Sequence, residues 1–177
     1  MLSRFSYGKE KCKINRIRRQ AGGGGIMMWG LVLPNGLIAL KKVVGHQTSE
    51  NYIEILSKYA VPLIKLNLKE DFGLVQDNSR THTAKKVKDY MASQAIKVIE
   101  WPAVSPDLNI IENVWKMLSD VVYDGPQPRN LAELHLRIVD AVFQINTSRR
   151  DTITNLFETF SDRMVKVLTG KGSTINN

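Results

Sequence analysis

The chain has 177 residues, of which 43% are hydrophobic and 24% are charged, a composition typical of one globular domain with a single buried core. No stretch approaches the roughly 18 consecutive apolar residues that cross a bilayer, and the one cysteine, Cys12, excludes a disulfide within the chain. These numbers exclude a membrane-spanning protein and a disulfide scaffold, and they fit a protein of a reducing, intracellular compartment.

The net charge of +8 is concentrated at the start of the chain, where residues 1–20 hold seven basic side chains and one acidic one. The basic residues are Arg4, Lys9, Lys11, Lys13, Arg16, Arg18 and Arg19. We define residues 1–21 as a basic leader. One interpretation is that the leader binds phosphate backbones without sequence preference, through Arg16, Arg18 and Arg19, and the other is that it is a solvated terminus.

Four glycines at residues 22–25 end the leader, and a β-hairpin is expected directly after them. Residues 26–33 are apolar and predict a buried strand, and residues 37–44 predict a second one. The Pro-Asn-Gly sequence at 34–36 favours a tight turn between them. We therefore expect the two strands to pair.

Helices and strands alternate in the next part of the chain. The apolar residues over 51–66 recur at helical spacing and predict a helix with one buried face. Residues 72–76 predict a third strand, which stops at Asp77. An amphipathic helix over 83–93 and a fourth strand over 96–101 are expected to follow.

The last third of the chain predicts three helices. Residues 105–107, Ser-Pro-Asp, suit the first positions of a helix whose apolar stripe continues to Val122. Glu112 lies on that helix, at the margin of the stripe. Two further helices are expected over 130–145 and 150–168, separated by a short polar break.

This order of elements indicates an α/β layered domain over residues 22–170, with a polar tail at 171–177. Asp77 and Glu112 are candidate ligands of a divalent metal, because open α/β sheets bind ligands at the carboxyl ends of their strands. Carboxylate oxygens suit magnesium or manganese, and two such ions support phosphodiester chemistry. Taken alone, however, most acidic pairs of this kind are surface residues or helix caps.

Three motifs favour the metal-site interpretation of Asp77 and Glu112 over these alternatives. They are Gly-Gly-Gly-Gly-Ile-Met-Met-Trp-Gly at 22–30, Gln-Asp-Asn at 76–78 followed by His-Thr-Ala at 82–84, and Trp-Pro-Ala-Val-Ser-Pro-Asp-Leu-Asn-Ile-Ile-Glu-Asn at 101–113. In this order they resemble the catalytic domain of mariner-superfamily transposases, of the branch whose third acidic residue is Glu. The resemblance covers about residues 7–170, and the block at 101–113 is its most specific part.

The resemblance implies a ribonuclease H-like fold, a mixed sheet flanked by helices. It also implies metal-dependent DNA cleavage and strand transfer in DNA transposition, with two Mg²⁺ or Mn²⁺ ions held by three acidic residues. Asp77 matches the second acid and Glu112 the third. Asn78 and His82 lie in the matching motif, where they either shape the site or make structural hydrogen bonds.

Departures from the family pattern limit these expectations. The family's first catalytic aspartate lies on the central first strand, upstream of the glycine run, and no aspartate precedes Asp71 in this chain. Ile110 stands where the family motif usually has Pro, and the helix-turn-helix domains that recognise transposon ends are absent. We therefore expect an N-terminally truncated domain that binds metal weakly.

A missing central first strand also has a structural consequence. The strands at 26–33 and 72–76 would each lack a partner and leave backbone groups unsatisfied. The leader is expected to fill this gap imperfectly, because Cys12, Ile14 and Ile17 alternate poorly for a central strand. A second chain is the other source of a strand.

The prediction is thus a transposase-derived catalytic domain whose activity is lost or crippled by the absent aspartate. The alternative is a non-catalytic nucleic-acid-binding or interaction module derived from a transposon. DNA is the expected partner, together with a homodimer or a complementing transposase chain, and the nucleus is the expected location. Lys85, Lys86 and Lys88 form a basic helix face that tracks DNA phosphate or is simply solvated.

Overall fold

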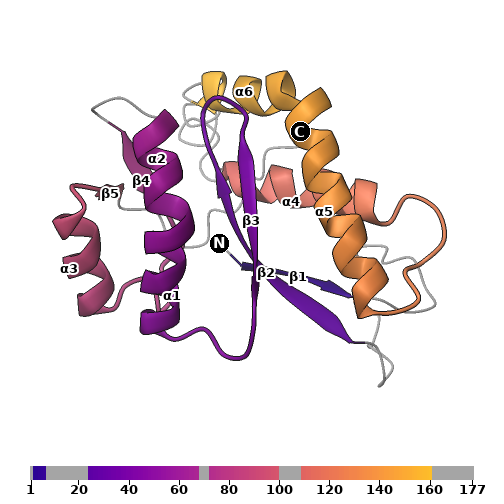
Figure 1. The fold of residues 1–177 in the computed structure, drawn as a ribbon. Helices are drawn as coiled ribbons and strands as arrows, with labels where there is room; N and C mark the ends of the chain where they lie inside the picture. The colour runs from indigo at the N-terminus through magenta and orange to yellow at the C-terminus, as the bar shows by residue number, and fades with distance from the viewer. Residues whose placement is uncertain (1, 7–23, 68–71, 100–108, 161–177) are drawn as a thin grey trace, which may run out of the picture.

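The computed structural model describes residues 2–6, 24–67, 72–99 and 109–160, and their strands form two sheets (Figure 1). The larger sheet is antiparallel, in the order β1 (Leu2–Ser6), β2 (Gly25–Val32), β3 (Ile38–Val43). The smaller sheet is a parallel pair, β4 (Gly73–Val75) and β5 (Lys97–Ile99). Strands were predicted at all of these places except β1.

The predicted hairpin is confirmed, because β2 and β3 pair in an antiparallel register. In the connecting turn Gly36 has a φ of +77°, and the Leu33 N–H donates to the Leu37 carbonyl oxygen at 2.9 Å. A side chain at Gly36 would also collide with the backbone of Arg150. This turn position therefore needs glycine for its backbone conformation and for the close approach of another segment.

The helix predicted over 51–66 is confirmed as one helical segment. It consists of α1 (Ser49–Ile55), a π-helical turn η1 (Leu56–Ala60) and α2 (Val61–Asn67). Thr48 begins it, since its Oγ1 accepts the backbone N–H of Asn51 at 3.2 Å. That bond satisfies one of the N–H groups that the first turn of a helix leaves without a partner.

The remaining helices are α3 (Lys85–Ser93), α4 (Ile110–Val122), α5 (Leu131–Ser148) and α6 (Arg150–Glu158). The polar break predicted after residue 145 is wrong, because α5 continues to Ser148. The polar side chains have partners compatible with a helix: Asn146 accepts the Ile38 N–H at 2.8 Å and donates to the Ile38 carbonyl oxygen at 2.9 Å, and the Thr147 and Ser148 hydroxyls donate to the Gln144 carbonyl oxygen. The predicted start of the Glu112 helix at 105–107 is wrong, because Asn109 is extended and caps α4, which begins at Ile110. The predicted end of the last helix at 161–168 lies outside the described residues.

Helices cover both faces of the β2–β3 hairpin, and each face has its own apolar core (Figure 1). On one face Met28 and Ile38 pack with Trp115, Leu118 and Ile138 of α4 and α5. On the other face the hairpin packs against α1, α2 and α3, with buried side chains that include Trp29, Leu31, Tyr52, Leu56 and Met91. The alternation of β2 explains this division, because successive side chains point to opposite faces.

The strand β1 corrects one expectation about the sheet. It belongs to the leader and pairs with β2 from Leu2↔Trp29 to Ser6↔Gly25, so the leader does supply β2 with a partner strand. The expected poor alternation concerns residues 12–17, whereas the strand forms upstream of them. The pairing of β1 with β2 ends at Trp29, so β1 does not reach the last three residues of β2. The strand predicted at 72–76, β4, also has a partner, because it pairs with β5.

Among the described residues, no helix is both long enough and apolar enough to span a bilayer.

Candidate active site

Asp77 lies two residues beyond the end of β4, at the start of the loop that leads to α3. Its Oδ1 accepts the backbone N–H of Ser79 at 3.1 Å and lies 2.5 Å from Nδ1 of His82. The Asp77 side chain is 39% exposed, whereas that of His82 is 1% exposed. Asp77 is thus held from the protein side and remains accessible from the solvent side.

These contacts fix the charge of Asp77. The hydrogen bond from His82 holds the pKa of the Asp77 carboxyl well below its usual range, burial opposes this, and the Ser79 backbone N–H supports it. Asp77 is therefore ionised throughout the physiological pH range. An ionised carboxylate is the form that binds a metal.

Glu112 is the third residue of α4 and lies in a more apolar environment than Asp77. The helix begins at Asn109, whose side chain accepts the Ile111 N–H at 3.4 Å and whose carbonyl oxygen accepts the Glu112 N–H at 3.0 Å. Ile110 and Ile111, the two residues before Glu112, are buried, and Glu112 itself is half-buried. Apolar packing of α4, with its N-cap, therefore sets the position of Glu112.

Burial raises the pKa of the Glu112 carboxyl, and the negative charge of Asp77 raises it further. Gln76, the residue before Asp77, and Ile111, the residue before Glu112, line one apolar cavity, although 34 residues separate the two acids in sequence. The segments that carry the two acids therefore border one cavity, and the two carboxylates repel each other electrostatically. Their mutual repulsion is what a bound cation would relieve.

The donor set fits a hard divalent cation in its chemistry but is small. Oδ1 of Asp77 is in contact with His82 and Ser79, and the carboxylates of Asp77 and Glu112 are the candidate oxygen donors. Oxygen donors of this kind suit Mg²⁺ and Mn²⁺. Within the described ranges, no group of three His, Cys, Asp or Glu side chains is placed to hold a metal.

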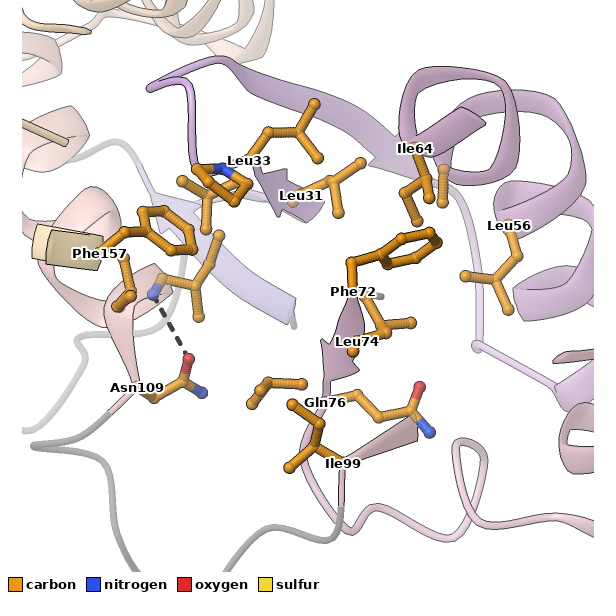
Figure 2. A pocket seen from close by; sticks show the side chains of 18 of the residues that line it. Leu31, Leu33, Leu56, Ile64, Phe72, Leu74, Gln76, Ile99, Asn109 and Phe157 are labelled. Atoms are coloured by element: carbon orange, nitrogen blue, oxygen red, sulfur yellow. Dashed lines mark hydrogen bonds between the residues drawn. The ribbon is translucent and has the colours of Figure 1, made fainter. Parts of the chain in front are cut away.

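An apolar cavity of about 410 Å³ borders this region (Figure 2). It lies between the end of β2, the α1–α2 segment, β4 and the start of α4, and Leu31, Leu56 and Phe72 supply part of its wall. Gln76 and Asn109 add polar groups to its lining. The cavity was not predicted, because it depends on how β2 and β4 are placed relative to each other.

The other predicted site residues are Asn78, the three lysines of α3 and the three arginines of the leader. Asn78 is exposed next to Asp77, so its role remains a prediction. Lys85, Lys86 and Lys88 are exposed on α3, as expected, and Lys86 forms an ion pair with Glu50 of α1. The leader residues Arg16, Arg18 and Arg19 lie outside the described residues.

Two residues that contribute to the site were not singled out by the sequence. The Tyr52 hydroxyl donates to Gln76 Oε1 at 2.8 Å, and its ring lies against the His82 ring with centroids 4.1 Å apart. Tyr52 was assigned only to the apolar stripe of its helix, because helical spacing cannot show that a buried hydroxyl has a polar partner. Gln76 belongs to the Gln-Asp-Asn motif, which was the one available signal.

Comparisons with known proteins agree with the motifs. A family model described as "DDE superfamily endonuclease" matches residues 4–135. The Tc3 transposase of Caenorhabditis elegans is 30% identical over 160 residues, which is 90% of this chain and 48% of that protein. The Tcb1 transposase of Caenorhabditis briggsae is 35% identical over 97 residues, 55% of this chain and 36% of that protein. The chain thus spans about half, or less, of the length of these relatives.

Solved structures show the same fold. The catalytic domain of the Mos1 mariner transposase has a TM-score of 0.67 at 15% identity, covering 86% of this chain and 76% of that one. A Mos1 catalytic domain with Raltegravir and Mg has a TM-score of 0.68 at 13% identity, covering 86% and 78%. The predicted ribonuclease H-like α/β fold is therefore confirmed.

Proposed function

Because this chain belongs to the DDE superfamily endonucleases and is homologous to the Tc1/mariner transposases, we propose that it carries part of a catalytic centre for DNA transposition. The observation that supports the proposal is that Gln76 and Ile111, the neighbours of Asp77 and Glu112 in sequence, line one cavity between the end of β4 and the start of α4. The chain covers 48% of the Tc3 transposase. We therefore propose only that its two acids contribute to such an activity, and not that the chain performs the whole of it.

Each carboxylate contributes differently to the proposed chemistry. Asp77 offers an ionised carboxylate that its neighbours already hold in place. Glu112 offers a half-buried carboxylate whose ionisation becomes easier once a cation offsets the charge of Asp77. Mg²⁺ or Mn²⁺ held there would supply Lewis acidity at a DNA phosphate. The Mos1 catalytic domain, solved with Mg and with Mn, supports this choice of ion.

We further propose that this chain alone has little or no strand-cleaving activity. It carries the counterparts of the second and third acids, and no aspartate precedes Asp71 in its sequence. Two-ion chemistry needs enough ligands to hold both ions in the correct geometry. With two carboxylates, weak binding of a single cation is expected.

A nicking assay tests this proposal. Supercoiled plasmid is incubated with the purified chain and Mn²⁺, in parallel with Asp77→Ala, Glu112→Ala and the matched control Asp89→Ala, which removes an exposed acid of α3. The expected result is the same background nicking for all four proteins. Metal-dependent nicking that Asp77→Ala and Glu112→Ala abolish, and that Asp89→Ala retains, would show an active enzyme and overturn the proposed inactivity.

The second candidate function is a non-catalytic nucleic-acid-binding module. The exposed Lys85 and Lys88, on the helix that follows the Asp77 loop, favour it. Fluorescence anisotropy with duplex DNA should then show affinity that falls with salt and survives Asp77→Ala and Glu112→Ala. Binding that does not respond to salt, or to Lys85→Gln with Lys88→Gln, would exclude this function.

DNA is accordingly the proposed partner, with a second copy of the chain or a complementing transposase chain beside it, and the nucleus is the proposed location. The Mos1 transposase paired-end complex with the left transposon end supports DNA as a partner; it has a TM-score of 0.60 at 13% identity and covers 87% of this chain and 53% of that one. Light scattering of the chain with and without DNA would measure the assembly, and a monomer under both conditions would exclude the homodimer.

A further inference from the structure

The starting observation is a buried polar contact in an otherwise apolar core. Tyr52 of α1 is 2% exposed, and its hydroxyl donates to Gln76 Oε1 at 2.8 Å. Burial raises the pKa of Tyr52, and the charge of Asp77 raises it further, so the hydroxyl stays protonated as a donor. A phenylalanine would fill the same core space, which means that packing alone does not require this hydroxyl.

Tyr52 also holds His82 through two routes. Its ring lies against the imidazole ring, with centroids 4.1 Å apart and planes tilted by 33°. Gln76, which accepts the Tyr52 hydroxyl, in turn donates from Nε2 to the His82 carbonyl oxygen at 3.3 Å. The ring contact and the hydrogen bonds therefore form a closed loop of Tyr52, Gln76 and His82.

Within this loop the His82 ring makes one polar contact that matters for the site. Its Nδ1 lies at an ion-pair distance of 2.5 Å from Oδ1 of Asp77, and both ring nitrogens are buried without a regular hydrogen bond among the described residues. The orientation of the ring is thus set by Tyr52 and by the backbone, and not by a hydrogen bond at Nε2. Because Ser79 also donates to Oδ1, both contacts act on one oxygen of the carboxylate.

We propose that Tyr52 is a positioning residue for the Asp77 carboxylate, acting through the His82 ring and Gln76 so that Oδ1 is engaged and Oδ2 is presented to a cation. This inference rests on the proposed function, since it assigns Asp77 as a metal ligand. It extends the site from the loop after β4 to the buried face of α1. The contacts among Tyr52, Gln76 and His82 then have a role beyond stability, because they select one side-chain rotamer of Asp77.

The rotamer of Asp77 tests the proposal without any metal. Three-bond NMR couplings from Cγ of Asp77 to its backbone N and carbonyl carbon report the χ1 population in the purified chain. We expect one rotamer in the wild type. Tyr52→Phe, which keeps the ring and loses the hydroxyl, should give mixed populations, and His82→Leu should give more mixing. The matched control is Tyr59→Phe, the same change on η1, outside the loop of contacts.

Two further variants and a second readout separate positioning from a general loss of structure. His82→Asn retains a side-chain N–H near the place of Nδ1 and should restore the single rotamer that His82→Leu loses. Thermal unfolding of each variant shows whether it is folded at the temperature of the NMR measurement. Mn²⁺ affinity, measured by electron paramagnetic resonance, should fall about 10-fold in Tyr52→Phe and be unchanged in Tyr59→Phe.

Unchanged Asp77 couplings in folded Tyr52→Phe and His82→Leu would overturn the proposal. If the wild-type chain binds no Mn²⁺ at all, the proposed metal site fails, yet the couplings still decide whether Tyr52 positions Asp77. If Mn²⁺ affinity falls equally in Tyr52→Phe and Tyr59→Phe, the effect is one of general stability and the positioning role is excluded.

Discussion

The two carboxylates of the site are held in opposite ways. Asp77 is on a loop, where polar contacts with His82 and Ser79 lower its pKa. Glu112 is on a helix, where burial raises its pKa and the neighbouring charge of Asp77 adds to the effect. One acid is thus stabilised as an anion by the protein, while the other is destabilised as an anion until a cation arrives.

This contrast shows which part of the molecule supports each acid. The Asp77 side depends on a few hydrogen bonds, whereas the Glu112 side depends on the apolar packing of α4 against β2 and α5. Substitutions should therefore act by different mechanisms on the two sides.

Loss of apolar packing under α4 should have the largest effect. Leu118 is 0% exposed in the core that supports the Glu112 helix, and Leu118→Ala should lower the free energy of unfolding by about 3 kcal/mol, because it leaves a cavity. Urea denaturation measures this. The control is Leu136→Ala on α5, where the side chain is 64% exposed and a change of about 0.5 kcal/mol or less is expected. Equal losses for both variants would contradict the assigned core.

Neutralising Asp77 should destabilise the protein. Asp77→Asn weakens the charged hydrogen bond with His82, and the free energy of unfolding should fall by about 1 kcal/mol at pH 7, a value reduced because the side chain is 39% exposed. Denaturant unfolding measures the loss, with Asp89→Asn on the surface of α3 as the matched control. A loss no larger than that of the control would show that the contact with His82 does not stabilise the fold.

Neutralising Glu112 should have the opposite sign. In the metal-free protein Glu112→Gln removes a half-buried charge that repels Asp77, so the free energy of unfolding should rise by about 0.5 kcal/mol. The same unfolding experiment at pH 7 gives the value. If Glu112→Gln destabilises as much as Asp77→Asn does, the two acids are held in the same way and the contrast is wrong.

The pH dependence should separate the two acids further. The folded pKa of Asp77 lies below the ordinary value of 3.8, so its stabilisation is present above that value and is lost as the pH falls. The folded pKa of Glu112 lies above the ordinary value of 4.5, so stability is lost as the pH rises through that value. The deficit of Asp77→Asn should hence shrink in acid, and the advantage of Glu112→Gln should disappear below about pH 4.5.

Much of this architecture follows from local sequence pattern. The hairpin follows from two apolar runs around Pro-Asn-Gly and was predicted near its observed bounds, and the helices follow from their 3.6-residue periodicity. The start of α4 was predicted at 105–107, whereas the helix begins at Ile110 after the Asn109 cap. Asp77 and Glu112 were identified because strand ends and motif spacing are local features. These signals were sufficient for the fold class and for the two acids.

The remaining features depend on contacts between distant segments. The five residues of β1 form a strand only because β2 pairs with them, and Asn146 continues α5 while it pairs with the Ile38 backbone. The Tyr52 hydroxyl has its partner 24 residues away in sequence. Neither periodicity nor residue preference reports such partners, so these features could not be predicted from the sequence alone.

The most direct test of the account is a Mn²⁺ titration of the purified chain followed by electron paramagnetic resonance. Wild type and Asp89→Asn should bind one Mn²⁺ with the same weak affinity, and both Asp77→Asn and Glu112→Gln should lose that binding, because the proposed site needs both carboxylates. Equal Mn²⁺ binding in all four proteins would contradict the assignment of Asp77 and Glu112 as a shared metal site.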